Sequence, residues 1–249
     1  MSPLGEIILG RRGTIDKYMG DAIMAFWNAP LDDPDHAAHA CRAAIDMASR
    51  MEELNRHWQA QASAAGRPFS QVHIGIGINT GRCCVGNLGS TYRFDYSALG
   101  DEVNITSRFE GLSKIYGVTA VVGDQVLVRA KDFPALELDL VQVKGRTRPA
   151  RVHTFLELLG AERLKLEHLQ ALHLQFLTAY RAQRWTDAQR LLDACREIGV
   201  LRLDHCYALF EGRVASLRKT GLPANWNGSF AMTEKQPRYR TSGFKQQHA

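Results

Sequence analysis

The chain has 249 residues, of which 45% are apolar and 23% are charged. These proportions are typical of a globular protein and exclude collagen-like, mucin-like and wholly disordered chains. No apolar run approaches the roughly 18 residues needed to span a bilayer, and the N-terminus lacks the basic region and apolar core of a signal peptide. We therefore expect one or two globular domains without a transmembrane helix.

The net charge and the cysteine content bear on the expected partners and the cellular location. The net charge is +5, and residues 219–249 hold five basic residues and one acid, so the body of the chain is close to neutral. A nucleic-acid-binding domain usually carries a basic face on its folded part, so no nucleic-acid partner is expected. The cysteines number five and show no CxxC spacing, which favours reduced thiols and a cytoplasmic location.

The N-terminal part alternates predicted strands and helices. Residues 14–27 hold two β-rich runs on either side of Gly20-Asp21, which predicts a hairpin with a two-residue turn. Apolar residues recur at helical spacing across residues 33–66. In residues 72–79 aliphatic side chains alternate with a face that carries two glycines, which predicts a strand that another element approaches closely.

The pattern of mixed strands and helices continues to residue 158, so an α/β domain is expected over residues 1–158. The further predicted elements are a helix at 101–116, a short buried strand at 118–123, and two strands at 136–143 and 150–158 joined by a turn around Lys144-Gly145-Arg146.

Beyond Gly160 the pattern is purely helical. Residues 161–218 predict three helices that resemble one tetratricopeptide-like unit with an additional helix. A single unit of this kind cannot bury its own apolar face, so we expect it to pack on the first domain or on a partner. Residues 219–249 show no periodicity and predict a mostly unfolded basic tail.

Two pairs of polar residues are candidates for chemistry. Asp21 lies at the hairpin tip with Lys17 nearby, where a carboxylate can present its oxygens to Mg²⁺, although aspartate is also simply a good turn residue. Asn104 and Arg108 are four residues apart on a predicted helix and leave it on the same face. Arginine suits a phosphoryl group and asparagine a sugar oxygen, but an ordinary polar helix face would look the same.

A third pair, Lys144 and Arg146, falls in the turn between the last two predicted strands. Two cationic side chains in a turn suit contact with an anion. They suit a solvated turn equally well.

Four stretches of the sequence resemble the catalytic domain of class III adenylate/guanylate cyclases. They are GTIDKYMGDAIMAFWNAP, HIGIGINTGRCCVGNLGS, DYSALGDEVNITSR and LVQVKGRT, and the resemblance covers about residues 6–157. Residues 161–230 are similar to the helical extension of bacterial receptor-type cyclases, which carry an extracytoplasmic CHASE-type sensor and membrane helices upstream. The resemblance implies an α+β domain of ferredoxin-like descent, followed by a small all-α extension.

The resemblance also implies a reaction, the conversion of ATP to 3′,5′-cyclic AMP and pyrophosphate with two Mg²⁺ (or Mn²⁺) ions. It implies a head-to-tail homodimer in which each active site is built from both chains. The implied roles are metal binding by Asp21, purine contacts by Lys17 and Ser97, ribose orientation by Asn104, stabilisation of charge on the α-phosphoryl group by Arg108, and triphosphate binding by Arg146.

The sequence departs from the family pattern at its beginning. The family's domain opens with a strand that carries the first metal aspartate, followed by two helices and a triphosphate loop, and this chain begins within the second helix. By average element lengths, roughly 40 residues are expected to be absent. We therefore expect the domain to lack its first strand and helices, the chain as given to make little or no cyclic AMP, and any membrane attachment to depend on an upstream region.

Two functions of different classes stay open. The favoured one is an adenylate cyclase in intracellular signalling, with ATP preferred over GTP because Lys17 can only donate a hydrogen bond and adenine N1 accepts one. Ser97 can donate or accept, so its presence does not discriminate strongly between the bases. The alternative is a non-catalytic, cyclase-derived dimerisation or scaffold module that works through residues 161–218.

Overall fold

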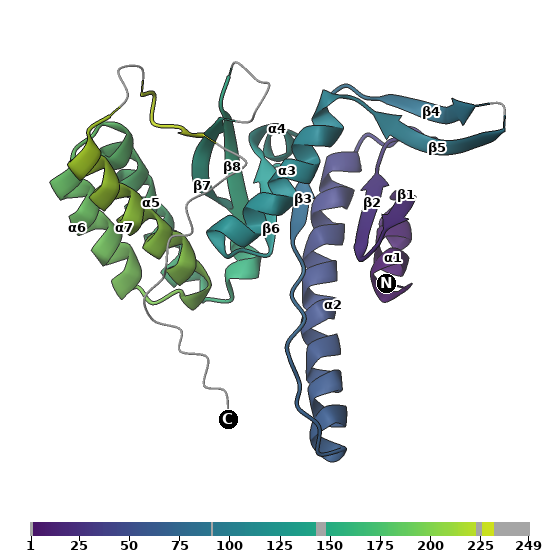
Figure 1. Cartoon of the computed structure of the whole chain (residues 1–249), viewed down its shortest axis with the longest axis horizontal. Coiled ribbons are helices and arrows are strands. Elements are labelled where there is room, and N and C mark those ends of the chain that lie inside the picture. Colours follow the sequence, from purple (N-terminus) through teal and green to yellow (C-terminus); the bar gives the residue numbers. More distant parts are fainter. Residues whose placement is uncertain (1, 91, 143–147, 223–225, 232–249) are drawn as a thin grey trace. The chain divides into compact units, whose positions relative to one another are not determined.

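The computed structural model describes residues 2–90, 92–142, 148–222 and 226–231, and contains both helices and strands (Figure 1). Contacts divide the chain into two compact units. Unit 1 holds residues up to 114 together with 118–136 and 152–158, and unit 2 holds 115–117, 137–151 and the chain from residue 159. Among the described residues, no helix combines the length and the apolar character needed to cross a bilayer.

The hairpin predicted near the N-terminus is confirmed. β1 (Thr14–Met19) pairs antiparallel with β2 (Ala22–Phe26), and the turn between them is Gly20-Asp21. Gly20 has a φ of 65°, a left-handed conformation that glycine adopts without the steric cost of a side chain. The short helix α1 (Ser2–Gly10) precedes the hairpin and packs beside β1.

A long helix, α2 (His36–Ala64), covers one face of three strands that lie wholly or mostly in unit 1 and belong to a five-stranded sheet (Figure 1). The sheet contains β3 (Ile76–Ile78), β6 (Ala120–Gly123) and β8 (Ala150–Phe155), with β3 parallel to β6 and β6 antiparallel to β8. The helix turns its small apolar residues toward the strands, where a close approach buries them. The short helix α4 (Asp124–Arg129) and the 3-10 turn η1 (Leu156–Leu159) adjoin this layer. The shared core includes Ala40, Cys41, Ala44, Ile45, Ala48, Ile78, Ala120, Val122, Val126 and Phe155.

The glycine-bearing face of β3 is approached by another helix, as the alternation of residues 72–79 predicts. This helix, α3 (Asp101–Tyr116), has the bounds expected from the sequence. A Cβ atom placed on Gly77 would collide with the backbone of Thr106 and Glu110, and one placed on Gly75 would collide with the Ser113 side chain. The backbone of α3 therefore lies directly on β3, and only glycine leaves room for it.

Replacing Gly77 by alanine is expected to lower the free energy of unfolding by about 1–3 kcal/mol, because neither colliding group is a flexible side-chain end. The matched control is Gly111→Ala on α3, where an added Cβ meets nothing within 4 Å. That control should stabilise the helix by about 0.5–1 kcal/mol, since alanine loses less backbone entropy than glycine. Urea unfolding of both variants would test this, and equal stabilities would contradict the packing described above.

The strand predicted over residues 72–79 is shorter than expected, because β3 begins only at Ile76. Upstream of it, the backbone of Val72 bonds to a side chain. Asn55 on α2 donates from Nδ2 to the Val72 carbonyl oxygen and accepts from the Val72 amide through Oδ1, both at 2.8 Å. Two polar backbone groups are thus satisfied without a strand partner.

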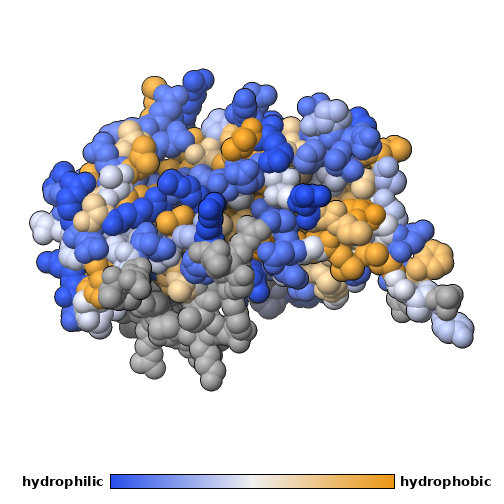
Figure 2. All heavy atoms as spheres, turned by 90° about the horizontal axis from the view of Figure 1, so that it is seen from above, coloured by the Kyte–Doolittle hydropathy of each residue, from blue (hydrophilic) through white to orange (hydrophobic). Residues whose placement is uncertain are grey.

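Residues 84–99 form a hairpin arm that the sequence analysis did not predict. β4 (Cys84–Ser90) pairs antiparallel with β5 (Arg93–Leu99) along its whole length (Figure 1). Tyr92 and Phe94 are 98% and 65% exposed on it. In Figure 2 the arm extends to the right, and apolar side chains are visible along it.

Unit 2 contains the three predicted helices, α5 (Arg163–Arg181), α6 (Trp185–Glu197) and α7 (Asp204–Thr220), with the 3-10 turn η2 (Leu201–Leu203) before α7. It also contains most of β7 (Ala135–Gln142). The strands predicted at 136–143 and 150–158 are thus found as β7 and β8, and the turn predicted between them lies outside the described residues. Buried apolar residues of the helices include Leu169, Phe176, Leu177, Leu192, Tyr207 and Phe210.

Part of the chain after residue 219 differs from the expectation of a mostly unfolded tail. The Trp226 ring lies 5.6 Å from Tyr180 and 5.9 Å from Trp185, measured between ring centroids. β9 (Phe230–Ala231) pairs with the end of β7. The aromatic residues of this short segment that make these contacts are Trp226 and Phe230. Two residues leave no periodic signal in a sequence. Residues 232–249 lie outside the described part of the chain.

A buried histidine joins α5 to β7 inside unit 2. His173 is 1% exposed, and its Nε2 lies 2.7 Å from the Glu137 carbonyl oxygen, which can only accept. Its Nδ1 lies 3.2 Å from the Tyr207 hydroxyl and accepts from it, so the neutral Nε2–H form fits. Burial lowers the pKa of His173 to about 4.

Because the pKa of His173 is lowered in the folded chain, we expect the free energy of unfolding to fall in mild acid. Because the folded pKa lies below the ordinary value near 6.5, the unfolded chain binds the proton first as the pH falls. The contribution is complete above pH 6.5 and disappears toward pH 4, about 3 kcal/mol in total. Urea unfolding at both ends of this range should show the loss in the wild-type chain and in His168→Gln, an exposed control on the same helix. The same slope in His173→Gln would show that another group titrates.

Candidate functional site

In unit 1, the β1–β2 hairpin and the β4–β5 arm bring three polar residues together. Two of them, Lys17 and Ser97, are predicted site residues, and the third is Asp16, which precedes Lys17. Ser97 on β5 donates a hydrogen bond from Oγ to Oδ2 of Asp16 on β1, at 2.6 Å. The Lys17 ammonium lies 3.2 Å from Oδ1 of the same carboxylate. Lys17 and Ser97, which are 80 positions apart in the sequence, therefore meet at one carboxylate.

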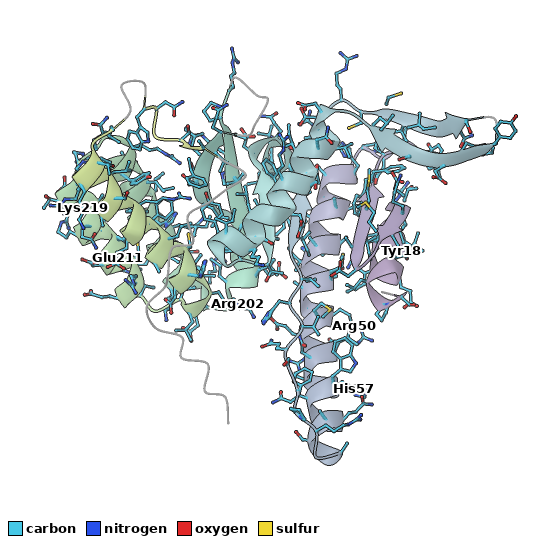
Figure 3. All side chains as sticks on the ribbon, viewed as in Figure 1. Tyr18, Arg50, His57, Arg202, Glu211 and Lys219 are labelled. Carbon is cyan, nitrogen blue, oxygen red and sulfur yellow. The ribbon has the colours of Figure 1, made fainter. Side chains whose placement is uncertain are left out.

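The two predicted purine-contact residues differ in exposure. The Lys17 side chain is 42% exposed and Ser97 is 6% exposed, whereas the Asp16 side chain is fully buried. Lys17 lies next to the half-exposed Tyr18, which Figure 3 labels on the same strand. A charged, accessible amine beside a nearly buried hydroxyl suits the edge of a flat polar ligand, which needs one donor and one neighbouring polar atom.

Asp21 is exposed at the hairpin turn, as the sequence predicts. Among the described residues, no group of three or more histidine, cysteine, aspartate or glutamate side chains could hold a metal ion. Mg²⁺ is commonly bound by one or two carboxylates together with substrate phosphates and water, rather than by a protein cage. A single exposed carboxylate fits that mode of binding, with the substrate completing the coordination.

Asn104 and Arg108 lie one turn apart on α3, and Asn104 is exposed. The buried face of the helix carries Ile105, Phe109 and Leu112, each 1% exposed or less. Asn104 and Arg108 each precede one of these buried residues by one position. The polar pair therefore lies beside the buried face of the helix. Both side chains are therefore held on a rigid element, as precise contact with a ligand requires.

The start of α3 is held by polar contacts as well as by the glycines of β3. Asn79 donates from Nδ2 to Oε2 of Glu102 at 2.6 Å. A Cβ on Gly81 would collide with the same glutamate side chain. Glu102 thus connects the first turn of α3 to the loop after β3, two residues before Asn104.

The remaining predicted site residue is Arg146. It lies outside the described residues, as does Lys144, so its role stays a prediction. The five other predicted residues come from β1, the hairpin turn, β5 and α3, all within unit 1.

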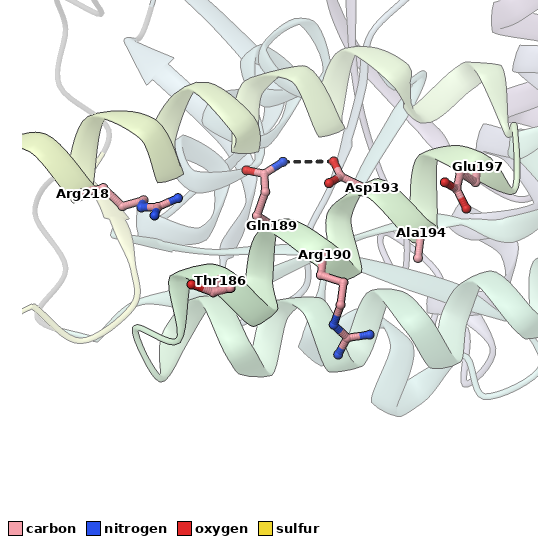
Figure 4. Close-up of a pocket in the computed structure, with 7 residues that line it drawn as sticks. All are labelled: Thr186, Gln189, Arg190, Asp193, Ala194, Glu197 and Arg218. Atoms are coloured by element: carbon pink, nitrogen blue, oxygen red, sulfur yellow. Dashed lines mark hydrogen bonds between the residues drawn. The ribbon is translucent and has the colours of Figure 1, made fainter.

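A hollow on unit 2 involves none of these residues. It is formed by α6 with Arg218 of α7, and its lining mixes charges of both signs (Figure 4). Within it, Gln189 donates a hydrogen bond to Asp193 at 3.0 Å. Most of the polar residues that line the hollow are exposed to water, so it is an ordinary groove between helices.

Asp16 also belongs to the cluster of Lys17 and Ser97, and no motif in the sequence predicted it. In a regular strand, neighbours such as Asp16 and Lys17 point to opposite faces. The register of the hairpin shifts between Ile15 and Lys17, which leaves Asp16 without a partner on β2. Such a bulge turns a side chain away from its expected face, and no local pattern in the sequence signals it.

Comparison with known proteins agrees with the motifs. A family model described as the adenylate and guanylate cyclase catalytic domain matches residues 14–157. The chain is 35% identical over 159 residues to adenylate cyclase 1 of Rhizobium meliloti, which covers 64% of this chain and 23% of that protein. It is 34% identical over 154 residues to an adenylate cyclase of Anabaena cylindrica, which covers 60% of this chain and 29% of that protein. The chain thus spans about a quarter of the length of these relatives.

Solved structures show the same relationship. The adenylyl cyclase CyaB from P. aeruginosa matches with a TM-score of 0.56 and 30% identity, over 65% of this chain and 79% of that one. The guanylyl cyclase Cya2 matches with a TM-score of 0.53 and 30% identity, over 62% of this chain and 75% of that one. Sequence motifs, family model and α+β fold agree, and the chain belongs to the adenylate and guanylate cyclase catalytic-domain family.

Proposed function

We propose that this domain is an adenylate cyclase, which converts cytoplasmic ATP to 3′,5′-cyclic AMP and pyrophosphate. The observation that carries the choice of nucleotide is the position of Lys17, an exposed ammonium held beside Ser97 by a shared carboxylate. A lysine only donates hydrogen bonds. Adenine N1 accepts one, whereas guanine N1 carries a hydrogen and would face the ammonium unpaired.

In this mechanism the ribose 3′-oxygen attacks the α-phosphorus and pyrophosphate leaves. Asn104 orients the ribose by hydrogen bonding to the sugar, which places the attacking oxygen in line with the leaving group. Arg108, four residues along the same helix, stabilises the charge that builds on the α-phosphoryl oxygens as the bond forms. Because both side chains project from one rigid helix, their spacing is preserved throughout the reaction.

A divalent metal ion, Mg²⁺ or Mn²⁺, fits this reaction. Asp21 would hold it together with phosphate oxygens of the nucleotide, and Arg146 would add a cationic contact to the triphosphate. The ion would supply Lewis acidity at the phosphates when bound. The exposure of Asp21 at a tight turn supports this role, because its oxygens are open to a ligand.

We further propose that the domain works as a head-to-tail homodimer. The β4–β5 arm supports this, because an isolated two-stranded hairpin is only marginally stable in water. Tyr92 and Phe94 are 98% and 65% exposed on the arm, and Leu99 at its base is 59% exposed. A second copy that covers the arm would bury these side chains.

The test is a comparison of ATP and GTP turnover by the protein at the full length its gene encodes, with Mg²⁺ and then Mn²⁺. We expect cyclic AMP to form with the higher kcat/KM, and Asp21→Ala to abolish product with either metal. Asp32→Ala, an exposed aspartate of unit 1, is the matched control and should retain activity. Equal or better use of GTP would contradict the assignment of ATP.

The non-catalytic scaffold hypothesis has less support. It requires the helices of residues 161–218 to offer an apolar face to a partner. Many of their apolar residues are buried within unit 2, among them Leu169, Phe176, Leu192, Cys206 and Phe210. A stable dimer with no turnover of either nucleotide would nevertheless favour the scaffold over the enzyme.

A further inference from the structure

A buried carboxylate lies behind the two residues proposed to contact the base. The Asp16 side chain is fully buried, in a bulge of β1. Its Oδ2 accepts hydrogen bonds from the Ser97 hydroxyl at 2.6 Å and from the Ala98 amide at 3.3 Å. Its Oδ1 lies 3.2 Å from the Lys17 ammonium, without the geometry of a hydrogen bond. One carboxylate therefore contacts both base-reading side chains.

The contact with Ser97 decides what that hydroxyl can offer a ligand. A hydroxyl has one hydrogen, and an ionised carboxylate can only accept. At 2.6 Å the Ser97 hydrogen is committed to Asp16 in a short, charge-assisted bond. Only the lone pairs of Ser97 remain, so this serine acts as an acceptor toward a base.

The contact with Lys17 restricts where the ammonium lies. A lysine side chain loses considerable rotamer entropy when it is held in one place. The negative charge of the buried Asp16 carboxylate attracts the ammonium from 3.2 Å, and water screens part of this attraction because the Lys17 side chain is 42% exposed. The carboxylate thus holds the donor of Lys17 close to the acceptor of Ser97.

We propose that Asp16 is a positioning residue that makes this pair selective for adenine. The pair presents one donor and one acceptor, which match the N1 acceptor and the N6 amino donor of adenine. Guanine offers an N1 donor and an O6 acceptor, so it opposes both. This inference rests on the proposed cyclase function, and it removes the ambiguity of Ser97, whose hydroxyl alone could pair with either base.

The experiment measures kcat/KM for ATP and GTP in the protein at the full length its gene encodes. In Asp16→Ala the Ser97 hydroxyl is free to turn its hydrogen toward guanine O6, and Lys17 loses its anchor. The ratio of ATP to GTP efficiency should fall about tenfold, since each reversed polar contact changes binding on that scale. Asp132→Ala, an exposed aspartate of unit 1, is the matched control and should keep the wild-type ratio.

A second pair of variants separates positioning from a general loss of structure. The isosteric Asp16→Asn keeps an acceptor for Ser97 but loses the charge that attracts Lys17, so its ratio should fall less than that of Asp16→Ala. In a Ser97→Ala background, the substitution of Asp16 should change the ratio by less than it does alone. A thermal unfolding curve for each variant shows whether it folds. If Asp16→Ala does not fold, the ratio of ATP to GTP efficiency in Asp16→Asn decides the test.

The outcomes distinguish two failures. A wild-type protein that makes no cyclic product from either nucleotide would overturn the proposed function and this inference with it. A wild-type protein that prefers ATP, with the same ratio in folded Asp16 variants, would overturn the inference alone.

Discussion

Replacement of Arg108 by alanine should lower kcat about 10²–10³-fold, the loss typical of one donor that stabilises transition-state charge. KM should change far less. The guanidinium is needed most when the α-phosphoryl group carries additional negative charge, so its interaction strengthens between the ground state and the transition state. The measurement is steady-state production of cyclic AMP by the protein at the full length its gene encodes.

Two further variants show whether the effect belongs to the guanidinium. Lys114→Ala removes an exposed cation from the same helix and should leave kcat unchanged. Arg108→Lys keeps the charge but loses the planar fork that contacts two oxygens at once, so it should recover only part of the rate. An unchanged kcat in Arg108→Ala would make this arginine an ordinary surface residue and would weaken the assignment of Asn104 beside it.

The largest expected effect on stability comes from a buried ion pair in unit 2. Arg213 and Asp139 lie 2.6 Å apart, with side chains 4% and 0% exposed. The Tyr116 hydroxyl also donates to Asp139, at 2.7 Å, and the guanidinium carbon lies 3.7 Å from the centre of the Phe230 ring. In Asp139→Ala the guanidinium stays buried without its carboxylate, so the free energy of unfolding should fall by about 3–5 kcal/mol.

The matched control is the exposed pair of Arg196 and Glu211, which lie 2.9 Å apart, with Glu211 labelled in Figure 3. Because water screens this pair, Glu211→Ala should cost only about 0–1 kcal/mol. The double variant Asp139→Leu with Arg213→Met should be less destabilised than Asp139→Ala, since it leaves no unpaired buried charge. Urea unfolding of the three variants would test this order, and equal losses for Asp139→Ala and Glu211→Ala would refute it.

Local patterns in the sequence were sufficient for much of unit 1. The turn at Gly20-Asp21 and the bounds of α3 follow from interactions within a few residues, which a single sequence displays directly. The alternation around Gly77 likewise predicted close contact with another element, because a strand face without side chains can accommodate a backbone. The spacing of Asn104 and Arg108 also predicted that both lie on one face of α3, because residues four apart in a helix are about one turn apart.

Other features depend on residues far apart in the chain, and only the tertiary structure decided them. Asp16 contacts Ser97 because a bulge in β1 turns its carboxylate toward β5, and the bulge exists only in the pairing of two strands. β3 begins only at Ile76, and upstream of it the side chain of Asn55 on α2 binds the Val72 backbone. Phe230 is held by Arg213 and by the end of β7. A sequence shows the periodicity of each element, but pairing and burial between distant segments arise only when the whole chain packs.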